Sequence, residues 1–225
     1  LTINLNDVTL AASDNDALVN EAGLPAGTAN DDSDIFTTGQ ITVSGGTGPY
    51  TYAITGSGGS NLGTINLNTG TGEYTYTLNT PFDGPHTNSS THAEDNKQVV
   101  SPTVTDANGN TSATGTIFVD VIDDVPTAYA NSNTVVEGAT VTGNLLTDGT
   151  ADVFGADGAA VTAPVGGITG IRAAGADTTT AVTNGVTVVA TTLGTLTLGA
   201  NGSYTYLANA NAITGNATDT FVYTI

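Results

Sequence analysis

The chain has 225 residues and a formal net charge of −19 at pH 7, because 21 acidic residues face only two basic ones. Such a charge repels phosphate backbones and anionic lipid surfaces, which argues against nucleic acid as a partner. The absence of cysteine excludes disulfides and thiolate metal sites. No stretch approaches the roughly 18 apolar residues of a membrane-spanning helix, so we expect no membrane insertion.

Internal similarity is the most informative feature of the sequence. The segment LTINLNDVTLAA (1–12) matches IFVDVIDDVPTA (117–128), and each is followed by an acidic turn, VNEAG at 19–23 and VVEGA at 135–139. The two matching segments begin 116 residues apart. Such a period is too long for a solenoid coil and predicts tandem domains instead.

The first residues predict a β-strand, because Leu1, Ile3 and Leu5 alternate with polar side chains. By the internal match, residues 1–7 correspond to the terminal strand of a preceding repeat. An alternative is that they form a donor strand, which completes the second domain of an identical subunit by strand exchange.

Two hairpins are predicted by a second internal match. GTINLNTGTGEYTYTL (63–78) aligns with GTLTLGANGSYTYLAN (194–209), and each has alternating apolar residues, a glycine-containing turn and a Tyr-Thr-Tyr return strand. The pattern places Tyr74 and Tyr76 on the same face as the apolar residues of the first strand.

About seven short strands per repeat, separated by Gly, Asn and Asp turns, indicate an all-β fold. We predict two tandem Ig-like antiparallel β-sandwiches joined by a short acidic linker. The first sandwich spans 8–122, and the second spans 123–225 and lacks its last strand. Pro126 cannot donate to a strand ladder and marks the boundary.

The candidate site lies at this linker, where two carboxylates are adjacent in the sequence. Asp123 and Asp124 follow a predicted strand in a chain with almost no basic residues. Close like charges are tolerated when a cation lies between them, and carboxylates with carbonyl oxygens are the ligands that Ca²⁺ prefers. We expect Glu137 and Asp106 to complete this calcium site. The alternative is a solvated linker whose charges prevent edge pairing.

Other acidic positions are weaker candidates. Asp7 and Glu21, with Asn6, form the parallel set at the N-terminus. Asp106 and Asn108 in DANGN resemble the first half of a calcium loop but lack the downstream glutamate, and a plain turn explains them equally well. Asp157 in FGADGAA lies in a glycine-flanked turn with the same ambiguity. No nucleophile motif or phosphate loop is present, so we expect no enzyme.

The quoted hairpins, the segment VDVIDDVPTAYANSNTVVEGATVTGNLL and the segment VTDANGNTSATGTIFVDVIDD resemble the tandem repeats of giant bacterial surface adhesins exported by type I secretion. These RTX adhesins include VCBS-type, cadherin-like and Ig-like repeats. The resemblance implies an extracellular extender at the bacterial cell surface that contacts neighbouring repeats of the same chain. It further implies linker calcium that stiffens a stalk for attachment and biofilm formation, with Asp123, Asp124, Glu137 and Glu21 at the acidic positions.

Two other functions fit the sequence pattern. A self-assembling surface filament would use the N-terminal donor strand, and deletion of 1–6 would abolish its polymers. A carbohydrate-binding accessory module would need exposed aromatic side chains, whereas the tyrosines alternate at strand spacing and are expected to pack inward.

Overall fold

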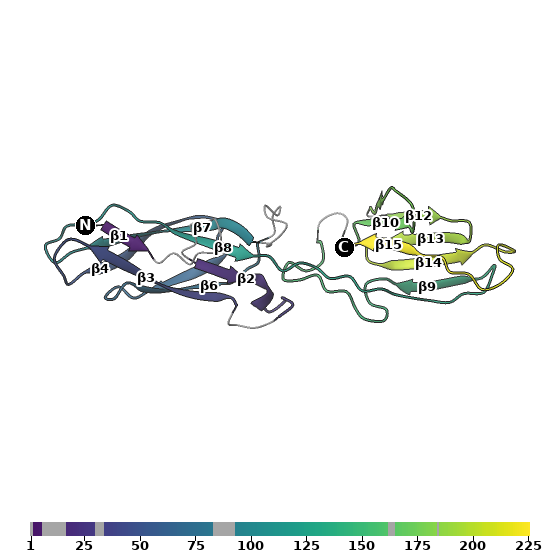
Figure 1. The fold of residues 1–225 in the computed structure, drawn as a ribbon, viewed down its shortest axis with the longest axis horizontal. Helices are drawn as coiled ribbons and strands as arrows, with labels where there is room; N and C mark the ends of the chain where they lie inside the picture. Colours follow the sequence, from purple (N-terminus) through teal and green to yellow (C-terminus); the bar gives the residue numbers. More distant parts are fainter. Residues whose placement is uncertain (1, 6–16, 30–33, 83–92, 162–164, 184) are drawn as a thin grey trace. The chain divides into compact units, whose positions relative to one another are not determined.

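The structure is a computed structural model that describes residues 2–5, 17–29, 34–82, 93–161, 165–183 and 185–225 (Figure 1). These residues form β-strands and one short 3₁₀ turn, which confirms the all-β fold. The chain divides into two compact units. Unit 1 comprises Leu1–Val125 with Gly155–Asp157, and unit 2 comprises Pro126–Phe154 with Gly158–Ile225. Within the described residues, no helix has the length and apolar character needed to cross a membrane.

The described residues of unit 1 form two four-stranded sheets, with strand orders β1-β3-β6-β5 and β2-β8-β7-β4. All described pairings are antiparallel except the parallel pairing of β2 with β8. The elements are β1 (Thr2–Leu5), β2 (Ala17–Asn20), the 3₁₀ turn η1 (Glu21–Gly23), β3 (Phe36–Ser44), β4 (Thr51–Gly59), β5 (Gly63–Leu67), β6 (Glu73–Leu78), β7 (Ala93–Thr105) and β8 (Ile117–Ile122).

The core of unit 1 follows from the alternation of side chains along its strands. In β6, Tyr74, Tyr76 and Leu78 are buried at every second position. The hydroxyl group of Tyr76 is buried too, and it donates to Gln98 Oε1 at 2.8 Å. The same amide oxygen accepts from the backbone N–H groups of Leu62 and Gly63, both at 3.1 Å. The polar end of the tyrosine is therefore satisfied inside the core.

In unit 2, the residues that the structure describes form one four-stranded sheet, of order β12-β13-β14-β9, and one three-stranded sheet, of order β11-β10-β15. Its pairings are antiparallel. The strands are β9 (Thr140–Asn144), β10 (Gly170–Ala173), β11 (Thr180–Ala181), β12 (Val186–Ala190), β13 (Gly194–Gly199), β14 (Ser203–Ala208) and β15 (Phe221–Thr224). A separate buried cluster that includes Ile168, Ile171 and Leu198 forms its core.

Both predicted hairpins are confirmed as antiparallel pairs, β5 with β6 and β13 with β14. The match extends to the strand that flanks each hairpin. In unit 1, β3 pairs with β6, and Tyr74 packs directly over Gly39. In unit 2, β9 pairs with β14, and Tyr204 packs over Gly143 in the same way. The internal repeat of the sequence is therefore also a repeat of local packing.

The N-terminal strand and the boundary differ from the sequence prediction. Strand β1 pairs with β3 inside unit 1, where Ile3 faces Val43 and Leu5 faces Ile41 in the register, while Leu1 lies outside the described residues. Residues 2–5 therefore belong to unit 1 instead of forming a separate segment 1–7. Unit 1 runs through Val125, so Asp123 and Asp124, which the predicted ranges assigned to the second domain, make their contacts in unit 1.

Candidate metal centre

Glu21 enters the interior because it continues the alternation of β2. Ala17 and Val19 point into the core of unit 1, so the next odd-numbered residue points inward as well. The chain then turns into η1, where the side chain of Asn20 caps the turn by accepting from the N–H of Ala22 at 3.0 Å. A carboxylate is thereby placed at the end of the sheet with no exposed surface.

Asp123 reaches the same position from β8. Ile117, Val119 and Val121 are fully buried, and Asp123 follows them in the same phase. Because β2 and β8 run parallel with Val19 opposite Val121, two further residues along each strand bring Glu21 opposite Asp123. The register of one strand pair therefore explains why two acidic residues 102 positions apart in the sequence become neighbours.

The third carboxylate comes from Asp157, in the segment Gly155–Asp157 that belongs to unit 1. Ala156 is buried in the core cluster of unit 1 and anchors this segment. Gly155 has φ +77°, and a Cβ at this residue would lie 2.0 Å from the carbonyl oxygen of Asp124. The close approach of the two backbones therefore requires glycine at this position.

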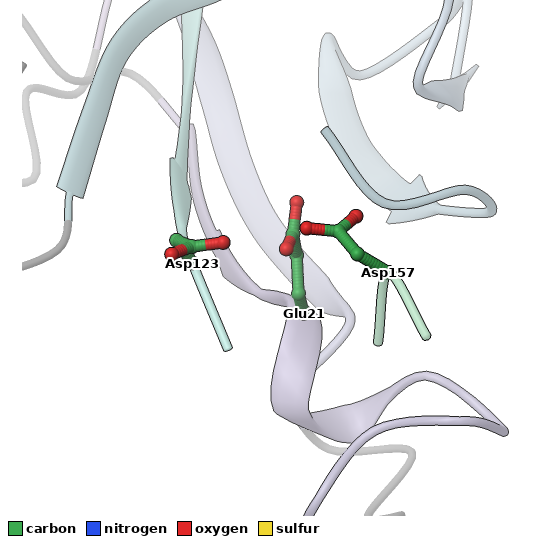
Figure 2. Close-up of side chains that lie close together, drawn as sticks. All are labelled: Glu21, Asp123 and Asp157. Carbon is green, nitrogen blue, oxygen red and sulfur yellow. The ribbon is translucent and has the colours of Figure 1, made fainter. Parts of the chain in front are cut away.

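The three side chains place one carboxylate oxygen each within 4.8 Å of one another. Figure 2 shows the carboxylate of Glu21 lying between those of Asp123 and Asp157. Oε1 of Glu21 accepts a hydrogen bond from the backbone N–H of Phe82. Oε2 of Glu21 is buried and has no hydrogen-bond partner among the described residues. A buried carboxylate oxygen without a partner is costly, so it points to a ligand that the protein alone does not supply.

The electrostatics of the cluster lead to the same conclusion. Burial raises the pKa of Glu21 to about 8, and the negative charges of Asp157 and Asp123 add to the rise, while the N–H of Phe82 opposes it. Without a cation, the cluster therefore holds a proton on Glu21 at neutral pH. A divalent cation between the three groups would reverse this and keep Glu21 ionised.

The three carboxylates form a hard-oxygen ligand set, which suits Ca²⁺ or Mg²⁺ better than zinc or copper. Ca²⁺ accepts irregular geometry and six to eight oxygen ligands, which backbone carbonyls and water can complete. Mg²⁺ demands a near-ideal octahedron and keeps most of its water. The residues present therefore fit calcium.

The other predicted ligands have different partners. Asp124, adjacent to the cluster in sequence, accepts from Thr28 through both the backbone N–H, at 2.8 Å, and Oγ1, at 2.6 Å. Glu137 lies in unit 2, where its Oε1 accepts from the backbone N–H of Ile213 at 2.9 Å. Asp7 lies outside the described residues.

Asp106 closes the loop after β7. Its Oδ1 accepts from the backbone N–H groups of Asn108 and Asn110, both at 2.9 Å, and its Oδ2 accepts from the N–H of Thr47 at 3.3 Å. Hydrogen bonds from Asn110, first from its side chain and then from its backbone, lower the pKa of Asp106, and those from Thr47 and Asn108 add to this. The loop donors therefore occupy the oxygens that a calcium ion would need, as in a plain turn.

We expect Asp106→Ala to loosen this loop without weakening calcium binding. The change removes the acceptor for several backbone N–H groups, whereas Asp106→Asn keeps one oxygen and should retain part of the protection. Hydrogen exchange of the loop amides, together with a calcium titration of both variants, measures the two effects.

The contribution of Asp106 to the stability of the folded state also depends on pH. Because the pKa of Asp106 is lowered, this contribution is present above about pH 4 and is lost as the pH falls further.

Sequence reasoning found Asp157 but did not connect it with the cluster. Its only signal was a glycine-flanked aspartate in FGADGAA. The sole lysine also has partners inside unit 1, because Nζ of Lys97 pairs with the buried Glu94 at 2.9 Å and lies 4.6 Å from the ring centroid of Phe82. No residue pattern indicated that pairing.

Comparisons with known proteins give little beyond this geometry. No protein-family model matches the chain, and no curated protein matches it. Among solved structures, the chain is similar to the D00-D0 domain of intimin at 12% identity, with a TM-score of 0.31 over 100% of this chain and 100% of that chain. A likeness at this level supports no argument about function, which rests on the residues described above.

Proposed function

We propose that this protein is a non-enzymatic structural segment of an extracellular bacterial adhesin, and that calcium stabilises it as part of a stalk for cell attachment and biofilm formation. The observation that supports this most strongly is the buried Glu21 carboxylate, which lies against Asp123 and Asp157 and whose Oε2 has no hydrogen-bond partner in the described part of the chain. The repeat resemblance of the sequence supplies the adhesin context.

Calcium would act on stability through binding to the folded state alone. Extracellular calcium modules work at about 10⁻⁴ to 10⁻³ M, and a ligand at 100 times its Kd stabilises the folded form by about 2.7 kcal/mol. The cation would also fasten Gly155–Asp157 to the rest of unit 1, because Asp157 is one of its ligands. With 21 acidic residues in the chain, calcium would further reduce charge repulsion in the compact state.

The experiment is a calcium titration of the full chain, followed by calorimetry and by hydrogen exchange. We expect millimolar calcium to protect the amides around Glu21 and Ile122 and to raise the Tm of unit 1 by several degrees, since about 1 kcal/mol shifts Tm by several degrees at this size. Asp123→Asn and Asp157→Asn should each weaken calcium binding by about tenfold or more.

Asp95→Asn is the matched control, because Asp95 is an exposed carboxylate of the same unit outside the cluster. Its calcium response should equal that of the wild type. If calcium protected no amide of unit 1, or if all three variants responded alike, the calcium part of the proposal would be abandoned.

The two other functions receive less support. Strand β1 already pairs with β3, so residues 2–5 are in use within their own unit. In unit 1, Tyr52, Tyr74 and Tyr76 are buried, so these tyrosines of β4 and β6 offer no exposed platform for a sugar ring.

A further inference from the structure

Unit 2 has a groove at the position where unit 1 has a strand. The groove has a volume of about 800 Å³. It is lined by the segment that precedes β9, by the facing side chains of β13 and β14, and by β15. Its apolar lining includes Tyr129, Leu196, Tyr204, Tyr206, Phe221 and Tyr223.

By the internal repeat, the strand that fills the equivalent space in unit 1 is β8. Strand β7 follows the first hairpin and lies between β4 and β8. Strand β15 follows the second hairpin and pairs with β10, and it has no second partner among the described strands. Unit 2 therefore has no described counterpart of β8.

The free edge of β15 carries backbone groups available for pairing. The carbonyl oxygens of Thr220 and Thr224 accept from Ala174 and Thr169 on the β10 side, at 2.8 Å and 2.9 Å. Because backbone groups alternate in direction along a strand, those of Phe221 and Tyr223 face the opposite side. An exposed edge of this kind accepts an added strand through main-chain hydrogen bonds.

Side-chain burial also differs between matched positions of the two units, as expected if a strand that covers the position in unit 1 has no described counterpart in unit 2. In unit 1, Val19 of β2 is 2% exposed, and among the described strands β2 pairs with β8 alone. By the 116-residue match, the counterpart of Val19 in unit 2 is Val135, which lies in no described strand and is half-buried. A valine that is buried in one copy is thus only half-buried in the other.

The acidic turn defines what the added strand must carry. Glu21 accepts from the N–H of Phe82 and Glu137 accepts from the N–H of Ile213, so both turn acids accept from the segment that follows their hairpin. In unit 1, β8 then brings Asp123 beside Glu21. A strand of the same pattern in unit 2 would bring its aspartate beside Glu137, where two like charges require a cation.

We propose that the groove of unit 2 binds an extended strand of the β8 pattern, apolar at alternate positions and ending in aspartate, which runs antiparallel to β15. A divalent cation then lies between Glu137 and that aspartate. The cation rests on the proposed function, whereas the strand rests on the groove and the free edge of unit 2 and on their comparison with unit 1.

The test uses the full chain and a labelled synthetic peptide of residues 115–124, GTIFVDVIDD. We expect binding by fluorescence anisotropy, with new hydrogen-exchange protection at Phe221–Thr224 and Asn133–Glu137 and none at β7. A peptide with Ile117→Ser, Val119→Ser and Val121→Ser should bind at least about tenfold more weakly, because it lacks the inward apolar face. Binding of this altered peptide at equal strength, or binding without protection at β15, overturns the proposal.

The cation is tested separately by repeating the binding in calcium and in chelator. Calcium should tighten binding by about tenfold for the wild type and not for Glu137→Gln, whose amide oxygen still accepts from Ile213. The matched control is Asp177→Asn, an exposed acid elsewhere in unit 2. Strand binding with no calcium effect removes the cation from the proposal. The proposed function is tested by a different measurement, the calcium-dependent hydrogen-exchange protection of the unit 1 amides, so the two proposals can fail independently. Self-association of the chain with protection at β15 would assign the groove to a second copy and overturn the choice of occupant.

Discussion

In calcium-free buffer, unit 1 is expected to lose stability as the pH rises from about 5 to about 8.5. Burial, with the charges of Asp157 and Asp123, raises the pKa of Glu21 from 4.5 to about 8. Between these two values the folded form keeps a proton that the unfolded chain has lost, so stability falls with rising pH across that window. Below about pH 4.5 the protonated Glu21 makes its full contribution to the stability of unit 1, and above about pH 8 this contribution is gone.

The variant that isolates this effect is Glu21→Gln. Glutamine has nearly the same shape but does not titrate, so the calcium-free Tm of unit 1 should no longer fall in this window and should exceed that of the wild type at pH 8.5. In calcium the order should reverse, because the wild type gains a ligand and the variant does not. Thermal unfolding at several pH values, with and without chelator, measures both. An equal pH dependence in wild type and variant would contradict a proton on Glu21.

The second large effect is expected for Gly63→Ala at the start of β5. A Cβ at this residue would lie 2.2 Å from the carbonyl oxygen of Thr77 and 2.6 Å from the hydroxyl oxygen of Tyr76. The carbonyl is part of the β5–β6 ladder, and Tyr76 is fully buried and bonded to Gln98. Neither neighbour can move freely, so we expect a loss of about 3 kcal/mol, at the upper end for overpacked cores.

Denaturant unfolding with hydrogen exchange assigns this loss to a unit. Gly194→Ala is the equivalent change in unit 2, where a Cβ would lie 2.3 Å from the hydroxyl oxygen of Tyr206, and it should act on that unit alone. Gly58→Ala, in β4, is the matched control, since no atom lies within 4 Å of its Cβ position. A similar loss for Gly58→Ala and Gly63→Ala would show that glycine content, rather than contact, sets the effect.

The sequence predicts the local features well because they depend on side chains close together in the chain. The alternation around Tyr74 and Tyr76 is enough to define a hairpin and its buried face. The acidic residues Glu21 and Asp123 are also visible as candidates. Each is adjacent to a strand, and neither is balanced by a basic neighbour.

The assembly of the site is not predictable in the same way. It depends on the parallel register of β2 and β8, and a shift of either strand by one residue would point the carboxylate of that strand out of the core. Asp157 depends on a further long-range contact, the approach of Gly155 to the backbone of Asp124. No period or motif records these two contacts. This is why the sequence suggests Glu137 as the partner of Asp123, whereas the structure places Glu21 there.

The parallel pairing of β2 and β8 also determines how unit 1 resists a pulling force. A force applied between the start of β2 and the end of β8 drags the two strands past each other along their length. Every rung of that ladder is then strained at once, whereas an antiparallel hairpin pulled at its open end separates one rung after another. In such a load path, unit 1 should behave as a mechanical clamp.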